Sequence, residues 1–150
     1  MIKKIVIFLL ITTLMSCGYT PIYLKKNNFN LSIKEYELLG EKKINRQIVS
    51  LLNLKKDDKE KSQYTLKLNS QKILEDVAKD KTGKVTIYKL ILNVDVELSE
   101  NEKLIKEKNF IKSFIFKNSD NKFDLMQYQK NIENNLINKL SEEIIIFLNT

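Results

Sequence analysis

The chain has 150 residues, of which 43% are hydrophobic and 30% are charged, and its 26 Lys and Arg against 19 Asp and Glu give a formal net charge of +7. This length and composition predict one folded domain with a modest core and argue against a disordered chain. The chain has no His and one Cys, which excludes Ser-His-Asp and Cys-His catalysis, a cysteine metal cluster and an intramolecular disulfide.

Residues 1–16 have the layout of a secretory signal peptide. Lys3 and Lys4 give a positive start, residues 5–15 carry no charge, and the small Ser16 ends the segment. The uncharged run is too short to span a hydrocarbon core about 30 Å thick, which needs about 20 apolar residues in a helix. A signal anchor or a buried core helix is the alternative, and it accounts less well for the flanking residues.

The stretch Leu14-Met15-Ser16-Cys17 resembles a bacterial lipobox, with an aliphatic residue at minus three, a small one at minus one, and then Cys. In lipoproteins of this kind the signal is cut before the Cys, which is then acylated on its thiol and its new amino terminus. Several acyl chains hold a domain to a membrane, whereas one chain anchors only reversibly. The resemblance implies that Cys17 is the lipidated first residue, and Gly18 after it favours sorting to the outer membrane.

The mature chain is predicted to begin with an acylated leader, residues 17–28, followed by a single domain, residues 29–150. Pro21 disfavours helix in the leader. Residues 29–36 alternate apolar and polar side chains, which predicts a strand, and Gly40 marks its break. Residues 41–54 have apolar residues at helical spacing, with Glu41 in the first turn and lysines near the end.

Three long strands are predicted next, joined by turns at 79–84 and 99–103. The first starts at residues 64–69, after which the alternation slips in a way that predicts a bulge or twist. Residues 85–98 alternate most clearly, which indicates a sheet with one buried and one wetter face. Residues 104–116 end in three Phe side chains on one side, Phe110, Phe114 and Phe116, which we expect in the core.

A final helix is predicted over residues 122–148, capped from the stretch 118–121. At 1.5 Å per residue it is about 40 Å long, enough to cross a sheet diagonally. Its polar face carries both Glu and Lys, which favours a helix covering a core over one lying on a membrane surface. The order β-α-β-β-β-α predicts an α+β two-layer sandwich, with two helices on one face of a four-stranded, mostly antiparallel sheet. The expected apolar stripe consists of Leu125, Ile132, Leu136, Leu140, Ile144, Phe147 and Leu148.

The sequence offers little that resembles a catalytic site. Acid pairs occur at 57–58, 75–76 and 142–143, but neighbouring carboxylates point to opposite faces of a strand or are solvated on a helix, so a hydrolase is the weakest hypothesis. We expect no enzyme activity, no metal and no cofactor. The export signal and the lack of an RNP or zinc-finger pattern argue against nucleic-acid binding. Lys79, Lys81 and Lys84 gather at one predicted hairpin end, where they either meet an anionic head group or form a solvated turn.

Three features together resemble the LptE family of lipopolysaccharide-assembly lipoproteins, in its alphaproteobacterial form. These are the start Cys17-Gly18-Tyr19-Thr20-Pro21-Ile22-Tyr23, the two-helix, four-strand order over nearly the whole mature chain, and the aromatic strand end, Asn/Asp turn and terminal helix in FKNSDNKFDLMQYQKNIENNLINKLSEEI. None of these motifs is catalytic.

The resemblance implies a non-enzymatic role at the periplasmic side of the outer membrane. Members of the family plug the lumen of a large outer-membrane β-barrel, LptD, support its assembly, and help deliver lipopolysaccharide, whose phosphates meet basic residues. A second hypothesis is a periplasmic lipoprotein that scaffolds other envelope proteins without touching lipopolysaccharide.

Overall fold

The structure is a computed structural model, and it describes residues 32–56 and 63–150. The predicted signal peptide, the leader and the first three residues of the predicted domain lie outside these ranges, and so does the Asp57-Asp58 pair. The elements follow the predicted order, with one short strand added after the first helix. They are β1 (Ser32–Gly40), α2 (Lys42–Leu52), β2 (Lys55–Lys56), β3 (Tyr64–Lys79), β4 (Val85–Glu100), β5 (Lys103–Lys117) and α3 (Lys122–Asn149).

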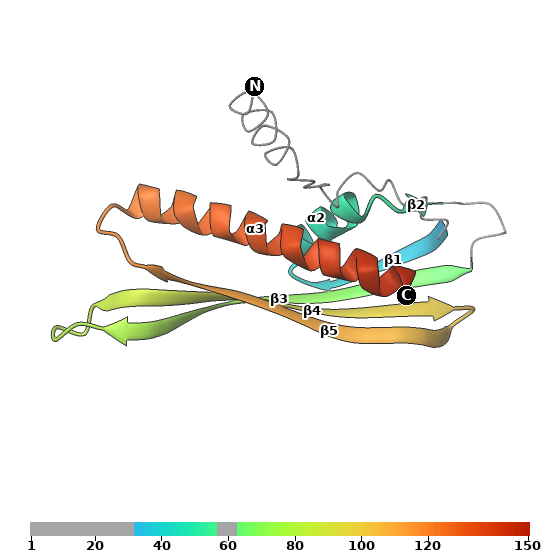
Figure 1. The fold of residues 1–150 in the computed structure, drawn as a ribbon, viewed down its shortest axis with the longest axis horizontal. Helices are drawn as coiled ribbons and strands as arrows, with labels where there is room; N and C mark the ends of the chain where they lie inside the picture. The colour runs from blue at the N-terminus through green and yellow to red at the C-terminus, as the bar shows by residue number, and fades with distance from the viewer. Residues whose placement is uncertain (1–31, 57–62) are drawn as a thin grey trace, which may run out of the picture.

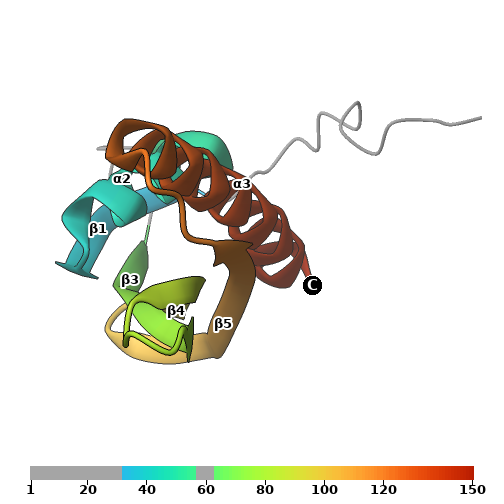
Figure 2. The same cartoon turned by 90° about the vertical axis from the view of Figure 1, so that its left-hand side faces the viewer.

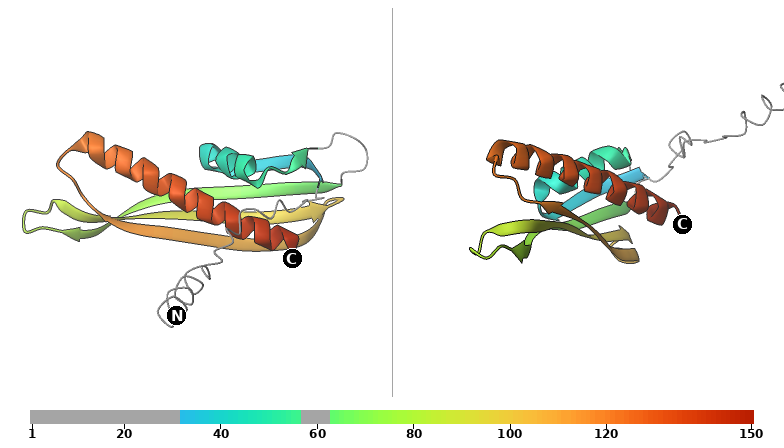
Figure 3. Two further views of the ribbon diagram at one scale, coloured as in Figure 1. Left: turned by 45° about the horizontal axis from the view of Figure 1, so that its top comes forward. Right: turned by 60° about the vertical axis from the view of Figure 1, so that its left-hand side comes forward.

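The strands form one mixed sheet in the order β2-β1-β3-β4-β5. β1 runs parallel to β3 and to the two-residue β2, whereas β3, β4 and β5 form an antiparallel meander. Both helices lie on the same face of this sheet, and α3 crosses it diagonally (Figures 1 and 3). The end-on view of Figure 2 shows the two layers, with the other face of the sheet left without a helix. The predicted α+β two-layer sandwich is therefore confirmed.

The core lies between the helices and the helix-facing side of the sheet. On β4 the alternation predicts this side correctly, because every second residue from Leu90 to Leu98 is buried. The predicted stripe of α3 is also confirmed, with Leu125 and Phe147 partly buried beside the fully packed members. Residues of α3 and α2 that close the core from above include Ile44, Ile48, Ile132, Leu136, Ile137, Leu140 and Ile144.

The irregularity predicted in β3 beyond residue 69 is present, but only near the end of the strand, at Val77. β3 pairs regularly with β4 from Tyr64 to Asp76, and the pairing shifts only around Ala78, next to the turn. The alternation slips at Ile73 because this side chain lies on the uncovered face of the sheet, opposite Ile91, where it is 42% exposed. At Ile73 the change of pattern therefore comes from an apolar residue on the uncovered face, and at Val77 it coincides with a shift of the pairing.

A tight corner joins β1 to α2. Gly40 has a φ of +70°, and a Cβ there would lie 2.0 Å from the Ser70 carbonyl oxygen, so this position requires glycine. The Glu41 amide donates to the same carbonyl at 2.9 Å, and the buried Asn45 side chain donates to the Leu39 carbonyl at 2.6 Å. Glu41 is the N-cap residue and makes no side-chain cap, so its predicted place in the first turn is wrong. The predicted lysines at the helix end are part of β2 instead, because α2 ends at Leu52 and its C-cap residue Asn53 has a left-handed φ of 48°.

The caps and length of α3 agree with the sequence. The Asn121 side-chain oxygen accepts hydrogen bonds from the amides of Phe123 and Asp124 at 3.0 and 3.4 Å, which makes it the N-cap. In the described residues, neither helix contains an apolar stretch of the length needed to cross a membrane.

Candidate functional site

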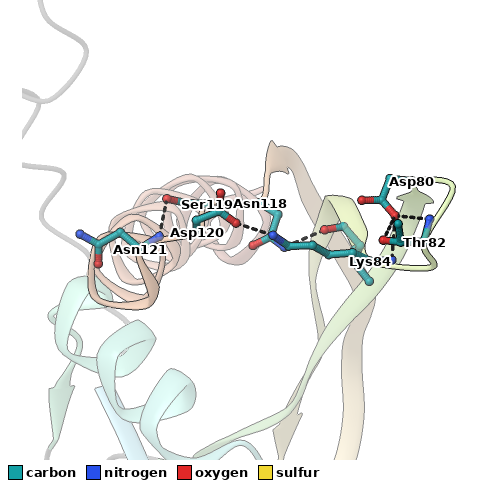
Figure 4. Close-up of polar contacts among 8 residues, drawn as sticks. Asp80, Thr82, Lys84, Asn118, Ser119, Asp120 and Asn121 are labelled. Atoms are coloured by element: carbon teal, nitrogen blue, oxygen red, sulfur yellow. Dashed lines mark hydrogen bonds and ion pairs between the residues drawn. The ribbon is translucent and has the colours of Figure 1, made fainter.

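The turn between β3 and β4, with the three lysines that the sequence singled out, lies at the end of the sheet away from α2 (Figure 1). The loop 118–121, which leads into α3, lies beside it (Figure 4). We refer to residues 79–84 together with loop 118–121 as the distal tip.

The turn is held by one carboxylate. Asp80 Oδ1 accepts hydrogen bonds from the Thr82 amide at 2.8 Å, the Thr82 hydroxyl at 2.6 Å and the Lys84 amide at 3.0 Å (Figure 4). The Gly83 amide donates to the Asp80 carbonyl at 3.0 Å, and Gly83 has a φ of +83°, as a hairpin turn closed by a left-handed residue requires. The backbone of the turn is therefore fixed, and its side chains project from a rigid support.

The loop before α3 is tied to the same hairpin. Asn118 donates from its backbone to the Thr86 carbonyl at 2.9 Å and from its side chain to the Val85 carbonyl at 2.7 Å. Lys84 forms an ion pair with Asp120, which joins the turn to the start of α3 (Figure 4). These bonds link the β3–β4 hairpin to the residues that precede the helix.

The charges of the distal tip stabilise one another. Hydrogen bonds from Thr82 hold the pKa of Asp80 below its ordinary value of 3.8, and the hydrogen bond from Lys84 does the same for Asp120. The hydrogen bond to Asp120 raises the pKa of Lys84 above 10.5. All three groups are therefore charged at neutral pH.

The three predicted lysines differ in their surroundings. Lys79 lies 3.3 Å from Asp76, and Lys84 is bound to Asp120. Lys81 is exposed at the turn and has no acidic partner among the residues that the structure describes. The sequence brought these lysines to one turn, but it did not show that two of the three ammonium groups are already paired.

The acid pairs considered for catalysis have other partners. Glu75 lies opposite Lys89 in the sheet, Asp76 pairs with Lys79, and Glu143 pairs with Lys112. Across residues 32–56 and 63–150, no group of three or more acidic, His or Cys side chains is arranged to hold a metal ion.

A second surface was not singled out from the sequence. Ile73 of β3, Ile91 of β4, and Ile111 and Ile115 of β5 lie on the uncovered face of the sheet, toward the distal tip. Ile111 and Ile115 are 59% and 57% exposed, and we call these four residues the isoleucine patch. In the sequence, these residues alternate with the apolar residues of the helix-facing side, so the strands are apolar on both faces near the patch. Apolar residues on both faces of a strand are the sequence signal that could have identified the patch.

No protein-family model and no curated protein matches this chain. Its fold is similar to that of the rare lipoprotein B from Shewanella oneidensis, with a TM-score of 0.57 at 15% identity over 74% of this chain and 90% of that one. It is similar to a minor lipoprotein from Acinetobacter baumannii, with a TM-score of 0.57 at 14% identity over 77% and 90%. It is also similar to a lipoprotein B from Nitrosomonas europaea, with a TM-score of 0.54 at 12% identity over 77% and 81%. At these identities the likeness establishes a shared fold.

Proposed function

We propose that this chain is an outer-membrane lipoprotein of the LptE type, which plugs and supports the assembly of a lipopolysaccharide-translocon β-barrel and helps deliver lipopolysaccharide to the cell surface. The observation that carries the proposal is the fold, which this chain shares with bacterial lipoproteins over about three quarters of its length. Cys17, at the end of a lipobox-like segment, supplies the anchor that such a role requires.

The exposed surfaces fit a protein that is enclosed by a partner. The isoleucine patch is apolar and lies outside the core, and contiguous apolar surface of this kind marks interaction sites. The uncovered face of the sheet gives a broad, rigid surface on which a barrel wall can rest (Figure 2). We therefore place the barrel contact on this face.

Co-purification tests the barrel partner. The tagged full chain, extracted from outer membranes in mild detergent, should bring down a large β-barrel protein in near-equal amount. Ile73→Glu should reduce the recovered barrel severalfold, whereas Gln71→Glu, an exposed residue on the same face of the same strand, should leave it unchanged. Recovery of the chain as a free protein from wild-type membranes would count decisively against the proposal.

The role in lipopolysaccharide delivery assigns the head-group contact to the distal tip. Lys81 is the ammonium group there with no acidic partner among the described residues, so it meets a phosphate without first breaking an ion pair. Lys81→Gln should weaken binding of purified lipopolysaccharide more than Lys79→Gln, and added salt should weaken binding of the wild type. Binding that ignores both salt and the combined Lys79, Lys81 and Lys84 to Glu substitutions would contradict a head-group contact at the distal tip, whereas no binding of lipopolysaccharide at all would favour the scaffold hypothesis.

The anchor is tested separately. Cys17→Ser should leave an unprocessed precursor that keeps residues 1–16, seen as a larger band and a larger intact mass. The matched control is Thr20→Ser, which lies in the leader outside the lipobox-like stretch and should be processed like the wild type. An unmodified Cys17 in the mass spectrum of the native protein would refute the lipidation.

A further inference from the structure

A shallow groove lies between the end of α2 and the second half of α3. The two helices touch where Gln47 donates to Asn134 at 3.2 Å, and the groove opens one turn further along both helices. The residues that line it are Leu51, Asn138, Ser141, Glu142 and Ile145, and its volume is about 370 Å³. Leu51 is 41% exposed, and Ile145 is half-buried at the edge of the core. The groove therefore has an apolar floor that is open in the part of the chain that the structure describes.

The chain enters the domain close to this groove. The structure describes the chain from Ser32 on, and the pairing of β1 with β2 sets Ser32 opposite Lys55, four residues beyond Leu51. Paired strands lie about 4.8 Å apart and consecutive Cα atoms about 3.8 Å apart, so the Cα of Ser32 is within about 20 Å of that of Leu51. An extended chain covers about 3.3 Å per residue, so residues 23–31 span about 30 Å. Residues 19–23 therefore reach the groove with length to spare.

The leader is more apolar than a free tether needs to be. Residues 19–24 are Tyr-Thr-Pro-Ile-Tyr-Leu, which places four large apolar or aromatic side chains within six residues. Flexible tethers consist mainly of Gly, Ser and charged residues, because such residues have little apolar surface to bury. Pro21 restricts the backbone around it to extended conformations, and a preformed extended segment enters an apolar groove with a small loss of chain entropy. The composition of the leader therefore predicts that it is buried against something.

The charges of the leader and of the groove are complementary. Lys25 and Lys26 directly follow the apolar stretch, and residues 17–31 contain no acidic residue. Glu142 places a carboxylate on the α3 side of the groove. An apolar segment followed by positive charge therefore matches an apolar floor with negative charge at its side.

We propose that the leader of this same chain docks in the groove between α2 and α3, with Ile22 and Tyr23 on its apolar floor. The two lysines that follow then lie toward Glu142. The leader is attached to the domain by a short connection, which gives it an effective concentration of about millimolar at the groove. A small groove that would hold a free molecule only weakly can therefore hold this segment, which favours the leader over a separate partner.

Docking would set where a membrane anchor leaves the domain. Cys17 precedes Ile22 by five residues, a span of at most about 18 Å. Acyl chains on Cys17 would then emerge beside the α2–α3 groove, and the domain would have a fixed orientation on the membrane. The docking itself does not rest on the proposed function, and only this consequence requires Cys17 to be lipidated.

Tryptophan fluorescence tests the docking, because the chain has no Trp of its own. In the full chain carrying Cys17→Ser, purified in detergent, Tyr23→Trp should emit at shorter wavelength and be quenched by acrylamide severalfold less than Asn27→Trp. Leu51→Lys should remove this protection, whereas Ile73→Lys, at 42% exposure against 41% but on the uncovered face of the sheet, should leave it unchanged. A Trp at position 23 that is exposed from the start would overturn the proposal. Protection that survives Leu51→Lys would also overturn it, because the leader would then be buried in detergent or against another surface.

Disulfide trapping in the same Cys17→Ser chain tests the position of the leader without a charge in the groove. Ile22→Cys is combined either with Ile145→Cys or with Lys139→Cys, an exposed position on α3 about a third of a turn away from Ile145. A disulfide requires Cα atoms within about 7 Å, so mild oxidation should close the first pair within one chain about tenfold more than the second. Equal yields would mean that the leader is a loose tether. Disulfide-linked dimers as the main product would mean that the leader occupies the groove of another copy, and either result would refute the proposal.

Discussion

Strand β3 is continuous, but its two halves, residues 64–70 and residues 71–79, differ in how far their helix-facing side chains are buried. In the first half, Leu66, Leu68 and Ser70 are fully buried on the helix-facing side. In the second half, Leu74 lies on the same side of the sheet and is 46% exposed. α2 packs on β1 and β3, whereas α3 packs on β4 and β5, so the outer part of β3 has no helix above it. Alternation therefore determines the face of the sheet on which a residue lies, and the layer packed against that face determines whether the residue is buried.

The uncovered face of the sheet shows the same division. Near the first half of β3 it is polar and bonded, with Lys67 3.1 Å from Glu97 and Asn109 donating to Asp95 at 2.6 Å. Toward the distal tip the same face carries the isoleucine patch. The half near α2 is closed by its own contacts, and the half toward the distal tip leaves apolar and charged groups exposed. Substitutions in each half test this division.

Truncating the same residue type in each half gives the sharpest contrast. Leu68→Ala should lower the free energy of unfolding by about 2–5 kcal/mol, because it leaves a cavity in a closed core. Leu74→Ala, six residues along the same strand and on the same side, should cost less than about 1 kcal/mol, because its side chain is nearly half exposed. Urea denaturation followed by circular dichroism measures both. Equal losses would mean that the outer half is covered in solution.

The two glycines with positive φ give a second contrast. Gly40→Ala should cost more than about 2 kcal/mol, because its Cβ would collide with the backbone carbonyl of Ser70. Gly83→Ala at the distal tip should cost about 1 kcal/mol, the backbone strain alone, because nothing lies within 4 Å of the added Cβ. The shift in thermal unfolding temperature ranks the two. A larger shift for Gly83→Ala would contradict the idea that the corner is the tighter site.

An ion pair marks the boundary between the two halves. Glu133 of α3 has only 10% of its side chain exposed, and Lys72 of β3 lies 2.7 Å from it. Lys72→Met should cost about 1–3 kcal/mol, because it leaves a nearly buried carboxylate without its close partner. Lys43→Met should cost at most about 1 kcal/mol, because Lys43 lies 3.9 Å from Glu133 and is 74% exposed. Chemical denaturation compares them, and a larger loss for Lys43→Met would be inconsistent with this assignment.

The sequence predicted the element order, the two layers and the distal lysine cluster, because these depend on local periodicity and turn residues. It could not predict which parts of each strand the helices cover. Phe114 was expected in the core with Phe110 and Phe116, and it has the correct face, but the diagonal course of α3 leaves it open. The ion pair between Lys84 and Asp120 could not be predicted from the sequence either, because these residues meet only when the chain returns from β5 to the start of α3. Long-range geometry, and not local propensity, decides both outcomes.

The smallest effect concerns the distal tip and its response to pH. The pKa of Asp80 and of Asp120 is lower in the folded chain than the ordinary 3.8, so their contribution is present above that pH and is lost as the pH falls below it. The raised pKa of Lys84 has the opposite sign, and its contribution is present below 10.5 and is lost as the pH rises through the higher, folded value. The turn should therefore keep its bonds from about pH 4 to pH 10 and loosen outside this window, while the buried half of the molecule stays folded.

Nuclear magnetic resonance titration of the Thr82 and Lys84 amides follows this directly, because both donate to the Asp80 carboxylate. Their shifts should change with a midpoint below 3.8, and Asp80→Asn should abolish the change, because an amide side chain accepts the same bonds without titrating. The amide of Leu92, in the closed core, serves as the reference for global unfolding. A midpoint at or above 3.8, or a simultaneous change at Leu92, would show that the distal tip does not titrate as an independent unit. The difference between the closed half of the molecule and its exposed half would then not extend to the distal tip.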